Sequence, residues 1–419
     1  MSYDHPPALS WNDARETLYS AGQRLYSQPI RHLPLRRAIG STLAKNLRAM
    51  LPIPHYDSSA MDGYAIAGPA PWRLIVPEYP DDSRANIHRV TLPLTSGQAT
   101  PIYTGGLLPA GAEAIVRTEH STSYTQGADT YITMADNRPV PAPGADMRYA
   151  GSELATGDLL AERGTLITAR MAAFLSVNGF DELPVFTRPT VQFAFTGNEV
   201  ITSGLPGPGQ VRDAFGSYME SMVESAGFTA LDAVRLPDDP HRVDEFLATS
   251  YADIMIFTGG SSTSGVDQVR TALARANASY LFESVDIRPG HPALAAVLPA
   301  PANNLGTGHG GVVLGLPGNP LAAYTALCSY LPPLLAGIYG KTMPQLETMP
   351  LSTPIAPFRK AKAHTFQRLV PVAASGGAVG ALPKHASHML SSFARSTHLA
   401  LLGPEEYSPG QSVPVLPVL

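Results

Sequence analysis

The fold is decided by VQFAFTGNE at residues 191–199 and by two later stretches of the same design, DIMIFTGGSS at 253–262 and VVLGLPGNP at 312–320. In each stretch an apolar run stops at a polar loop that contains glycine. Buried parallel strands read as continuous apolar runs, and their carboxyl ends meet at one sheet edge, where ligands bind. Glycine lets the backbone approach an anion, and loop N–H groups there can cradle oxyanions. The three stretches therefore predict a mostly parallel sheet with an oxyanion crevice at one edge.

The chain around these stretches alternates between strand and helix patterns. Further expected elements are a strand at 230–236 and helices at 216–226, 241–250, 266–276 and 320–331. Such alternation predicts a sheet covered by helices. We therefore expect an α/β domain at 189–339.

The flanking segments read differently. Ser10 can cap a helix that starts at Trp11 and stops at Pro29, and Thr168 can cap a helix at 169–178. This second helix either packs beside the first, making one domain from two segments, or belongs to the next domain. Short alternating runs at about 55–140 predict a β-rich insertion, and the last 80 residues predict a small β-sandwich or barrel.

These patterns predict an α/β plus β chain of several domains. The expected division is 1–53 with 142–188, then the insertion at 54–141, the α/β domain at 189–339 and the β domain at 340–419.

The composition narrows the class of protein. Of 419 residues 44% are apolar and 15% charged, with a formal net charge of −5 and no basic run, which argues against a nucleic-acid binder. Cys328 is the only cysteine and reads as a buried apolar side chain, so no internal disulfide forms. Residues 1–10 lack a signal-peptide pattern, and no apolar stretch reads as a membrane span. We expect a soluble cytoplasmic protein.

Acidic residues gather near the glycine loops. Glu199 follows the first strand, Asp238 and Asp239 precede Pro240, and Asp267 follows the second loop. Each alone has an ordinary interpretation, since Asp is common in turns and at helix caps. If they converge, carboxylates beside oxyanion loops suit a hard cation such as Mg²⁺.

Several motifs, taken together, resemble the MoeA family, which includes the gephyrin E domain. SSAMDGYA at 58–65 resembles the family's SxMDGYA signature, and IYTG at 102–105 with PAGAEAIV at 109–116 resembles the segment that follows it. TGNE at 196–199, the loop from 258 to 267, PGHP at 289–292, GLPGNP at 315–320 and SHML at 387–390 resemble later family motifs, in order along nearly the whole chain.

The resemblance implies insertion of molybdate into adenylylated molybdopterin in molybdenum cofactor biosynthesis, with Mg²⁺-dependent release of AMP. It implies an elongated homodimer whose site is shared between the α/β domain of one subunit and the β-rich insertion of the other. Molybdopterin adenylyltransferase or molybdoenzymes are the implied partners, with no nucleic acid and no membrane insertion.

The resemblance also implies roles for particular residues. The implied catalytic residues are Asp62, Glu199, Asp239 and Asp267, of which Glu199 and Asp267 would bind the metal. The implied substrate-binding residues are Thr104, Gly259, Gly260, Ser262, His291, Pro317, Gly318, Asn319 and Pro320.

Some positions depart from the family pattern. Asn198 stands where Asp is usual, Phe215 where Asn is usual, His291 where Lys is usual and Ala322 where Ser is frequent, while ADMR at 145–148 replaces N-I/V-R. Three hypotheses follow: an active molybdenumtransferase, a MoeA-like dimeric scaffold that binds a protein partner, or a related enzyme that adenylylates molybdopterin. The kept acidic residues favour the first, and the β-rich insertion with the C-terminal domain argues against the third.

Overall fold

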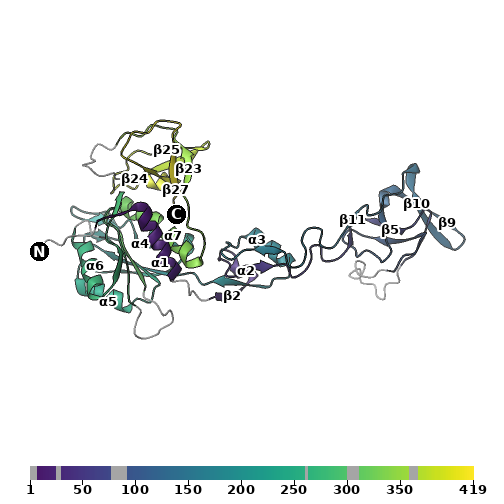
Figure 1. Cartoon of the computed structure of the whole chain (residues 1–419), viewed down its shortest axis with the longest axis horizontal. Coiled ribbons are helices and arrows are strands. Elements are labelled where there is room, and N and C mark those ends of the chain that lie inside the picture. Colours follow the sequence, from purple (N-terminus) through teal and green to yellow (C-terminus); the bar gives the residue numbers. More distant parts are fainter. Residues whose placement is uncertain (1–6, 25–29, 77–91, 260–262, 300–310, 358–366) are drawn as a thin grey trace. The chain divides into compact units, whose positions relative to one another are not determined.

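The chain folds into two compact units (Figure 1). The computed structural model describes residues 7–24, 30–76, 92–259, 263–299, 311–357 and 367–419, without side chains at 217 and 259–267. Unit 1 takes in residues 1–33, 38–44 and 183–419, and unit 2 takes in 34–37 and 45–182.

A six-stranded sheet forms the centre of unit 1. Its strands, in spatial order, are β17 (Thr229–Arg235), β14 (Thr190–Thr196), β18 (Ile254–Gly259), β22 (Val312–Gly315), β21 (Leu294–Val297) and β19 (Ser279–Phe282). The first four are parallel neighbours, whereas β21 is antiparallel to both of its neighbours, β22 and β19. The three apolar stretches thus lie side by side as β14, β18 and β22.

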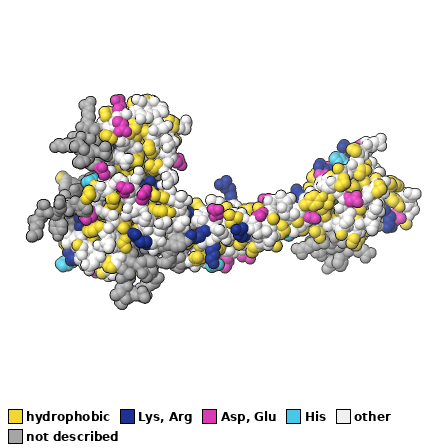
Figure 2. Space-filling view, viewed as in Figure 1, with side chains coloured by type: hydrophobic (Ala, Val, Ile, Leu, Met, Phe, Trp, Pro, Cys, Tyr) yellow, Lys and Arg dark blue, Asp and Glu magenta, His cyan; other side chains and the backbone are white. Residues whose placement is uncertain are grey.

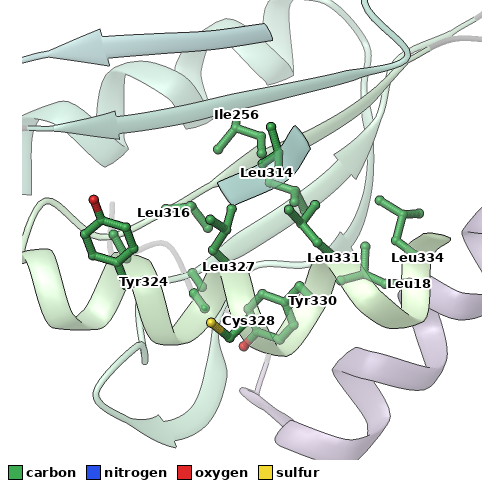
Figure 3. Close-up of a cluster of buried hydrophobic side chains, with 14 of the residues drawn as sticks. Leu18, Ile256, Leu314, Leu316, Tyr324, Leu327, Cys328, Tyr330, Leu331 and Leu334 are labelled. Carbon is green, nitrogen blue, oxygen red and sulfur yellow. The ribbon is translucent and has the colours of Figure 1, made fainter. Parts of the chain in front are cut away.

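Helices cover both faces of this sheet. They are α1 (Trp11–Arg24), α4 (Gly216–Ser225), α5 (Pro240–Thr249), α6 (Thr263–Arg275) and α7 (Pro320–Tyr339). One face packs on α1, α4 and α7, and Figure 3 shows Ile256 and Leu314 of the sheet facing Leu327 and Leu331 of α7. The other face packs on α5 and α6. Residues from both ends of the chain therefore share one core.

Helix α7 is longer than predicted. We expected it to end at residue 331, before Pro332 and Pro333, but it continues to Tyr339. Leu334 and Ile338 are fully buried, and this packing offsets the cost of proline inside a helix. Among the described helices α7 is also long and apolar enough to cross a membrane, contrary to expectation, yet 89% of its most apolar 18-residue stretch is buried inside the protein. It is the core helix of unit 1.

Helix α1 packs along α7. Two glycines permit the contact, because a Cβ at Gly22 would lie 2.3 Å from Leu334 O, and one at Gly337 would lie 2.1 Å from Tyr19 O. Trp11 Nε1 donates a hydrogen bond to Ser329 Oγ at 3.0 Å in the same interface. The helix at 169–178 is present as α3 (Ala169–Val177) in unit 2. The expected grouping of the two helices in one domain therefore does not hold for α1.

A seven-stranded sheet lies beside the α/β part of unit 1. It runs in the order β1 (Leu9–Ser10), β20 (Val285–Arg288), β24 (Gln367–Ser375), β26 (His398–Leu402), β27 (Ser412–Pro417) and β23 (Glu347–Pro350), with β25 (Ala378–Ala381) paired to β24. The sequence did not indicate that β1 and β20 join the C-terminal strands. This pairing carries the segment after β20 next to β24.

Small paired strands and helical turns complete unit 1. They are β2 (Ile30–Pro34) with β13 (Glu182–Phe186), which reach the border with unit 2, β15 (Val200–Ile201) with β16 (Val211–Arg212), and the 3₁₀ turn Phe393–Arg395.

Unit 2 is built around a second six-stranded sheet, in the order β8 (Ala114–Arg117), β5 (Gly63–Ala67), β7 (Gln98–Ile102), β6 (Trp72–Leu74), β10 (Asp129–Met134) and β9 (Ser121–Gln126). Smaller elements are the pairs β4 (Ser58–Ser59) with β11 (Met147–Arg148) and β3 (Leu47–Arg48) with β12 (Leu159–Ala161), the short helix α2 (Leu35–Ala38), and the 3₁₀ turns Thr118–His120 and Ala135–Asn137. The β-rich insertion predicted from short alternating runs is present here.

Candidate functional site

The carboxyl ends of β14, β18 and β22, where the three glycine loops begin, lie at one edge of the central sheet, as the sequence predicts. Thr196 lies opposite Gly259, and Phe257 lies opposite Gly315, so the ends of β14, β18 and β22 are in register. Thr258 Oγ1 also donates a hydrogen bond to Pro317 O at 3.4 Å, which links the second loop to the third.

The first loop is tied to the start of α5. Asn198 N–H donates to Asp238 Oδ2 at 3.3 Å, and Asp239 Oδ1 caps α5 by accepting from His241 N–H at 2.9 Å. Glu199 bends back over Gly197, whose φ of 118° only glycine adopts readily. The hydrogen bond thus joins the loop that carries Glu199 to the segment that carries Asp238 and Asp239. Asp239 also has a structural role, because it caps α5.

The second loop holds residues that the structure does not describe. Gly260 and Ser262 lie outside the described residues, as does the side chain of Asp267 on α6, and Gly259 is described only as the last residue of β18. In the described part of the chain no three His, Cys, Asp or Glu side chains are arranged to hold a metal ion. The predicted metal pair Glu199 and Asp267 stays a prediction.

A pocket of about 340 Å³ opens beside the third loop. It is lined by residues from four segments of unit 1: Arg288, Pro289, Gly290, His291 and Pro292; Pro317, Asn319 and Ala322; Arg368, Leu369 and Val370; and His385, Ala386 and Ser387. Four of these side chains are basic or can become so, and none is a carboxylate. We call this the basic pocket.

Strand pairing concentrates positive charge in the basic pocket. Arg288 of β20 and Arg368 of β24 are directly opposed in a parallel pairing. Arg368 also donates from Nη2 to Ala356 O at 2.7 Å, which fixes its stem, and burial lowers the pKa of its guanidinium. Glu405 acts on the charge of Arg368, and both arginines line the pocket.

Helix α7 begins at the same pocket. Its N-cap is Asn319 and its first residue is Pro320, which suits a first helical turn. Ala322 N–H donates to Ser387 O at 3.3 Å, so the SHML segment is held against this turn. The positive end of the α7 dipole adds to the charge of the arginines.

Both histidines of the pocket use the same ring nitrogen for structure. His291 Nδ1 lies 2.8 Å from Val285 O, and His385 Nδ1 lies 3.2 Å from Leu382 O. Since a carbonyl oxygen only accepts, Nδ1 is the donor in each pair. The Nε2 atom is left as the ring nitrogen available to a ligand.

Phe215 is buried in an aromatic cluster, so its departure from the family residue has a structural account. Its ring stacks on Phe195 at 6.3 Å between centroids and lies 6.1 Å from the ring of Tyr324. Tyr324 Oη donates to Ala214 O at 2.6 Å, and burial raises the pKa of this phenol to about 12. The phenol therefore stays protonated, and the cluster holds the loop before α4 in place.

Unit 2 brings Asp62 and Thr104 together. Asp62 Oδ1 accepts from Thr104 N–H at 2.6 Å and from Thr104 Oγ1 at 2.9 Å, although 42 residues separate the two in sequence. Both belong to predicted site motifs. The structure therefore joins two of the predicted residues in one exposed cluster.

The segment ADMR is stabilised by an ion pair. Asp146 accepts two hydrogen bonds from Arg117, at 2.7 and 2.9 Å, and this pairing lowers the pKa of Asp146. Its φ is 55°, a conformation that Asn and Asp tolerate better than most residues. The change from the family's Asn at this position is thus accommodated.

Sequence reasoning missed part of the basic pocket. Arg368 and His385 were not predicted as site residues, and no glycine loop or acidic motif marks them. Arg288, beside PGHP, and Ser387, in SHML, carried a signal because they adjoin motifs that the family resemblance had already singled out.

Comparisons with known proteins agree with these motifs. The family model of the MoeA N-terminal region (domain I and II) matches residues 9–179, and the model of a probable molybdopterin binding domain matches 193–337. A molybdopterin molybdenumtransferase from Synechococcus elongatus is 29% identical over 94% of this chain and 95% of its own length. One from Haemophilus influenzae is 26% identical over 92% and 93%.

Solved structures show the same fold. Two structures of the molybdopterin biosynthesis MoeA protein from Pyrococcus horikoshii match with TM-scores of 0.76 and 0.72, at 21% identity. The matches cover 99% and 98% of this chain and 100% of those chains. With the motifs in order, both family models matched and the fold shared along its length, the chain belongs to the MoeA family.

Proposed function

We propose that the chain is a molybdopterin molybdenumtransferase of molybdenum cofactor biosynthesis, which inserts molybdenum from molybdate into adenylylated molybdopterin and releases AMP. The observation that carries this is the basic pocket. It joins opposed Arg288 and Arg368, two histidines and the α7 N-terminus, and none of the described residues that line it is a carboxylate. Such a pocket suits a small tetrahedral oxyanion, and molybdate is the oxyanion that this reaction consumes.

The sheet edge at the ends of β14, β18 and β22, which we call the glycine-loop edge, would bind the adenylylated molybdopterin. Pro317 and Asn319 line the basic pocket, and the same loop borders the ends of β14 and β18. A phosphorylated substrate that occupies the edge would place its reactive end beside the oxyanion. Gly259, Gly260 and Ser262 would donate to its phosphates, and Gly318 and Pro320 would shape the loop.

A divalent cation fits the acidic side of this edge. Carboxylate oxygens are the ligands that Mg²⁺ prefers, and Glu199 with Asp267 would hold it, assisted by Asp239. When bound, Mg²⁺ supplies charge neutralisation at phosphate oxygens. The part played by this chain is to orient water and substrate through these carboxylates.

The remainder of the site would come from a second copy of the chain. Asp62 and Thr104 lie in unit 2 and form a preorganised donor and acceptor cluster. Exposed Tyr103 and Tyr149 lie in the same unit, and Figure 2 shows hydrophobic side chains on the visible face where β5, β9 and β10 are found. The proposed assembly is a homodimer whose two subunits share each site. We place it in the cytoplasm, and each subunit has the four domains that the family resemblance implies.

The test is reconstitution from purified components. The protein is mixed with adenylylated molybdopterin, molybdate and Mg²⁺, and AMP release and activation of an apo-molybdoenzyme are measured. The proposal expects both products, and an Asp267→Asn variant should lose about tenfold or more of the rate. Asp244→Asn, which changes a surface carboxylate paired with Arg275, is the matched control and should keep the rate. A folded protein that forms neither product would contradict the proposal.

A second candidate function is a scaffold that binds a protein partner. The observation in its favour is the set of changed site residues, above all Asn198 beside Glu199. Capture of a stoichiometric partner by a protein that fails the reconstitution assay would favour the scaffold. Reconstitution with full turnover would remove the need for it.

A further inference from the structure

A carboxylate outside the lining of the basic pocket acts on one of the two arginines inside it. Glu405 is exposed and is not among the described residues that line the pocket, yet its charge interacts with that of Arg368, which lines it. We propose that Glu405 is a specificity-determining residue, which sets how strongly the pocket prefers a doubly charged oxyanion to a singly charged one. This inference rests on the proposed function, because it concerns the oxyanion that the basic pocket binds.

Strand pairing places the Glu405 carboxylate near the base of Arg368. Arg368 of β24 is paired with Leu402 of β26, and Gly403 follows Leu402 directly. The Glu405 side chain folds back over this glycine, because a Cβ at Gly403 would lie 2.2 Å from Glu405 Oε2. The carboxylate therefore covers the residue next to the strand partner of Arg368.

Tyr407 holds this carboxylate in place. Its hydroxyl donates a hydrogen bond to Glu405 Oε1 and accepts one from Gly403 N–H at 2.7 Å. The tyrosine itself is buried in the core of the C-terminal strands, with 7% of its surface exposed. A hydrogen bond to a buried group limits the rotamers of an exposed side chain, so the negative charge of Glu405 keeps one position.

The same tyrosine also fixes a second contact of Arg368. Ile355 N–H donates to Tyr407 O at 2.9 Å, and Tyr407 N–H donates to Ile355 O at 3.0 Å. The next residue, Ala356, accepts the hydrogen bond from Arg368 Nη2 at 2.7 Å. The guanidinium and the carboxylate are thus both tied to Tyr407, so the fold sets the separation of these two charges.

Glu405 is ionised and Tyr407 is protonated at neutral pH. The hydrogen bond from Tyr407 lowers the pKa of Glu405, and the charge of Arg368 lowers it further. Burial raises the pKa of the Tyr407 phenol, and the hydrogen bond to Glu405 raises it too. The hydroxyl therefore stays the donor, and a permanent negative charge is held near the pocket.

A fixed negative charge near an anion site weakens binding in proportion to the charge of the ligand. It costs a dianion about twice the free energy that it costs a monoanion of the same shape in the same place. Glu405 therefore reduces the advantage that the arginines of the pocket give to a dianion. An oxyanion held less tightly is released more readily, which suits a site that passes it to a second substrate.

The experiment compares two tetrahedral oxyanions of similar size, the dianion molybdate and the monoanion perrhenate. Each is titrated calorimetrically into the purified full chain at neutral pH and low ionic strength. Glu405→Gln keeps an oxygen that accepts from Tyr407 but removes the charge. We expect this variant to bind molybdate about tenfold and perrhenate about threefold more tightly than the wild type, so the ratio of the two affinities rises about threefold.

Two further variants separate the charge from its surroundings. Glu406→Gln removes the neighbouring exposed carboxylate and changes the net charge equally, so it is the matched control, and its affinity ratio should stay close to the wild-type ratio. Tyr407→Phe keeps the buried ring but releases the Glu405 side chain into solvent, so the ratio should rise less than in Glu405→Gln. Adding Tyr407→Phe to Glu405→Gln should leave the ratio unchanged, because no charge is left for the hydroxyl to hold.

The outcomes distinguish this proposal from the pocket assignment. If Glu405→Gln keeps the wild-type affinity ratio, or if Glu406→Gln raises the ratio as much, the proposal about Glu405 is wrong while the pocket assignment stands. If the wild type binds neither oxyanion, the pocket assignment is wrong and the proposal about Glu405 falls with it.

Discussion

At the scale of single residues, hydrogen bonds hold the carboxylate of Asp62 in place, in the part of the proposed site that unit 2 supplies. Its Oδ1 accepts both the backbone N–H and the hydroxyl of Thr104. The carboxylate is therefore held in one orientation before any ligand arrives. A side chain fixed in this way loses less conformational entropy on binding.

Removal of the Thr104 hydroxyl tests this. Thr104→Val keeps the shape and the backbone donor but loses the 2.9 Å hydrogen bond to the carboxylate. A hydrogen bond to a charged group is worth about 1.5–3 kcal/mol, so AMP release should slow by about tenfold or more. Thr104→Ser keeps the hydroxyl and should retain most of the rate. Equal rates in both variants would show that the hydroxyl does not contribute.

The ion pair of Asp146 with Arg117 makes a prediction about stability and pH. The pKa of Asp146 is lowered from the ordinary value of 3.8, chiefly by its hydrogen bonds to Arg117. A lowered pKa gives stability that is present above the unfolded-state value and is lost as the pH falls through the folded-state value. Asparagine tolerates the same φ, so Asp146→Asn removes only the ion pair, and it should lower the thermal midpoint by a few degrees at neutral pH.

The difference in thermal midpoint between the wild type and Asp146→Asn should disappear as the pH falls below 3.8, because the aspartate is then protonated and loses its charge. Arg117→Gln should give the same curve, and the double variant should be no less stable than either single one. Additive losses would mean that the two residues act separately.

At the scale of elements, the contact between α1 and α7 fixes the core of unit 1. Gly337 is inside α7, where alanine would be the better helix former by about 1 kcal/mol. A Cβ there would lie 2.1 Å from Tyr19 O of α1. The two effects have opposite signs, so one substitution decides which one dominates.

We expect Gly337→Ala to destabilise the protein by about 1–3 kcal/mol, because overpacking forces the helices apart. Scanning calorimetry should show a lower thermal midpoint. Ser20→Ala, on the exposed side of α1, reports helix propensity alone and should leave the midpoint unchanged or slightly raised. A Gly337→Ala protein that melts higher than the wild type would mean that the contact is looser than described.

The elements also show what the sequence could and could not predict. The strands β14, β18 and β22 were predictable, because a continuous apolar run that ends at a glycine loop reflects burial on both faces. The end of α7 was not, because Pro332 and Pro333 are local stop signals that buried Leu334 and Ile338 override.

The basic pocket was predictable only in part, for a physical reason. His291 and Pro317 lie in motifs, but Arg368 enters through the pairing of β24 with β20, between residues 80 positions apart at Arg288 and Arg368. Such a pairing leaves no local pattern, because strand partners are chosen by the whole sheet. The catalytic and metal roles of Glu199 and Asp267 remain predictions.

At the scale of the whole molecule, the proposed site needs residues from both units. Asp62 lies in unit 2 and Glu199 in unit 1. In a symmetric dimer with shared sites, each site takes one residue from each subunit. Variants in the two residues should then rescue one another.

Complementation tests the shared site. Asp62→Asn and Glu199→Gln should each be inactive, whereas an equimolar mixture that has exchanged subunits should recover about a quarter of the wild-type AMP release. Two different affinity tags confirm that mixed dimers have formed. Mixed dimers with no activity would contradict sharing of the site between subunits.

The central claim is that the basic pocket binds the oxyanion that this protein uses. The direct measurement is the affinity of the full chain for molybdate, compared between the wild type, Arg368→Gln and the surface control Arg275→Gln. We predict saturable binding in the wild type and the control, and affinity at least about tenfold weaker in Arg368→Gln, because one charge-assisted contact is lost. Wild-type affinity in Arg368→Gln would contradict the claim.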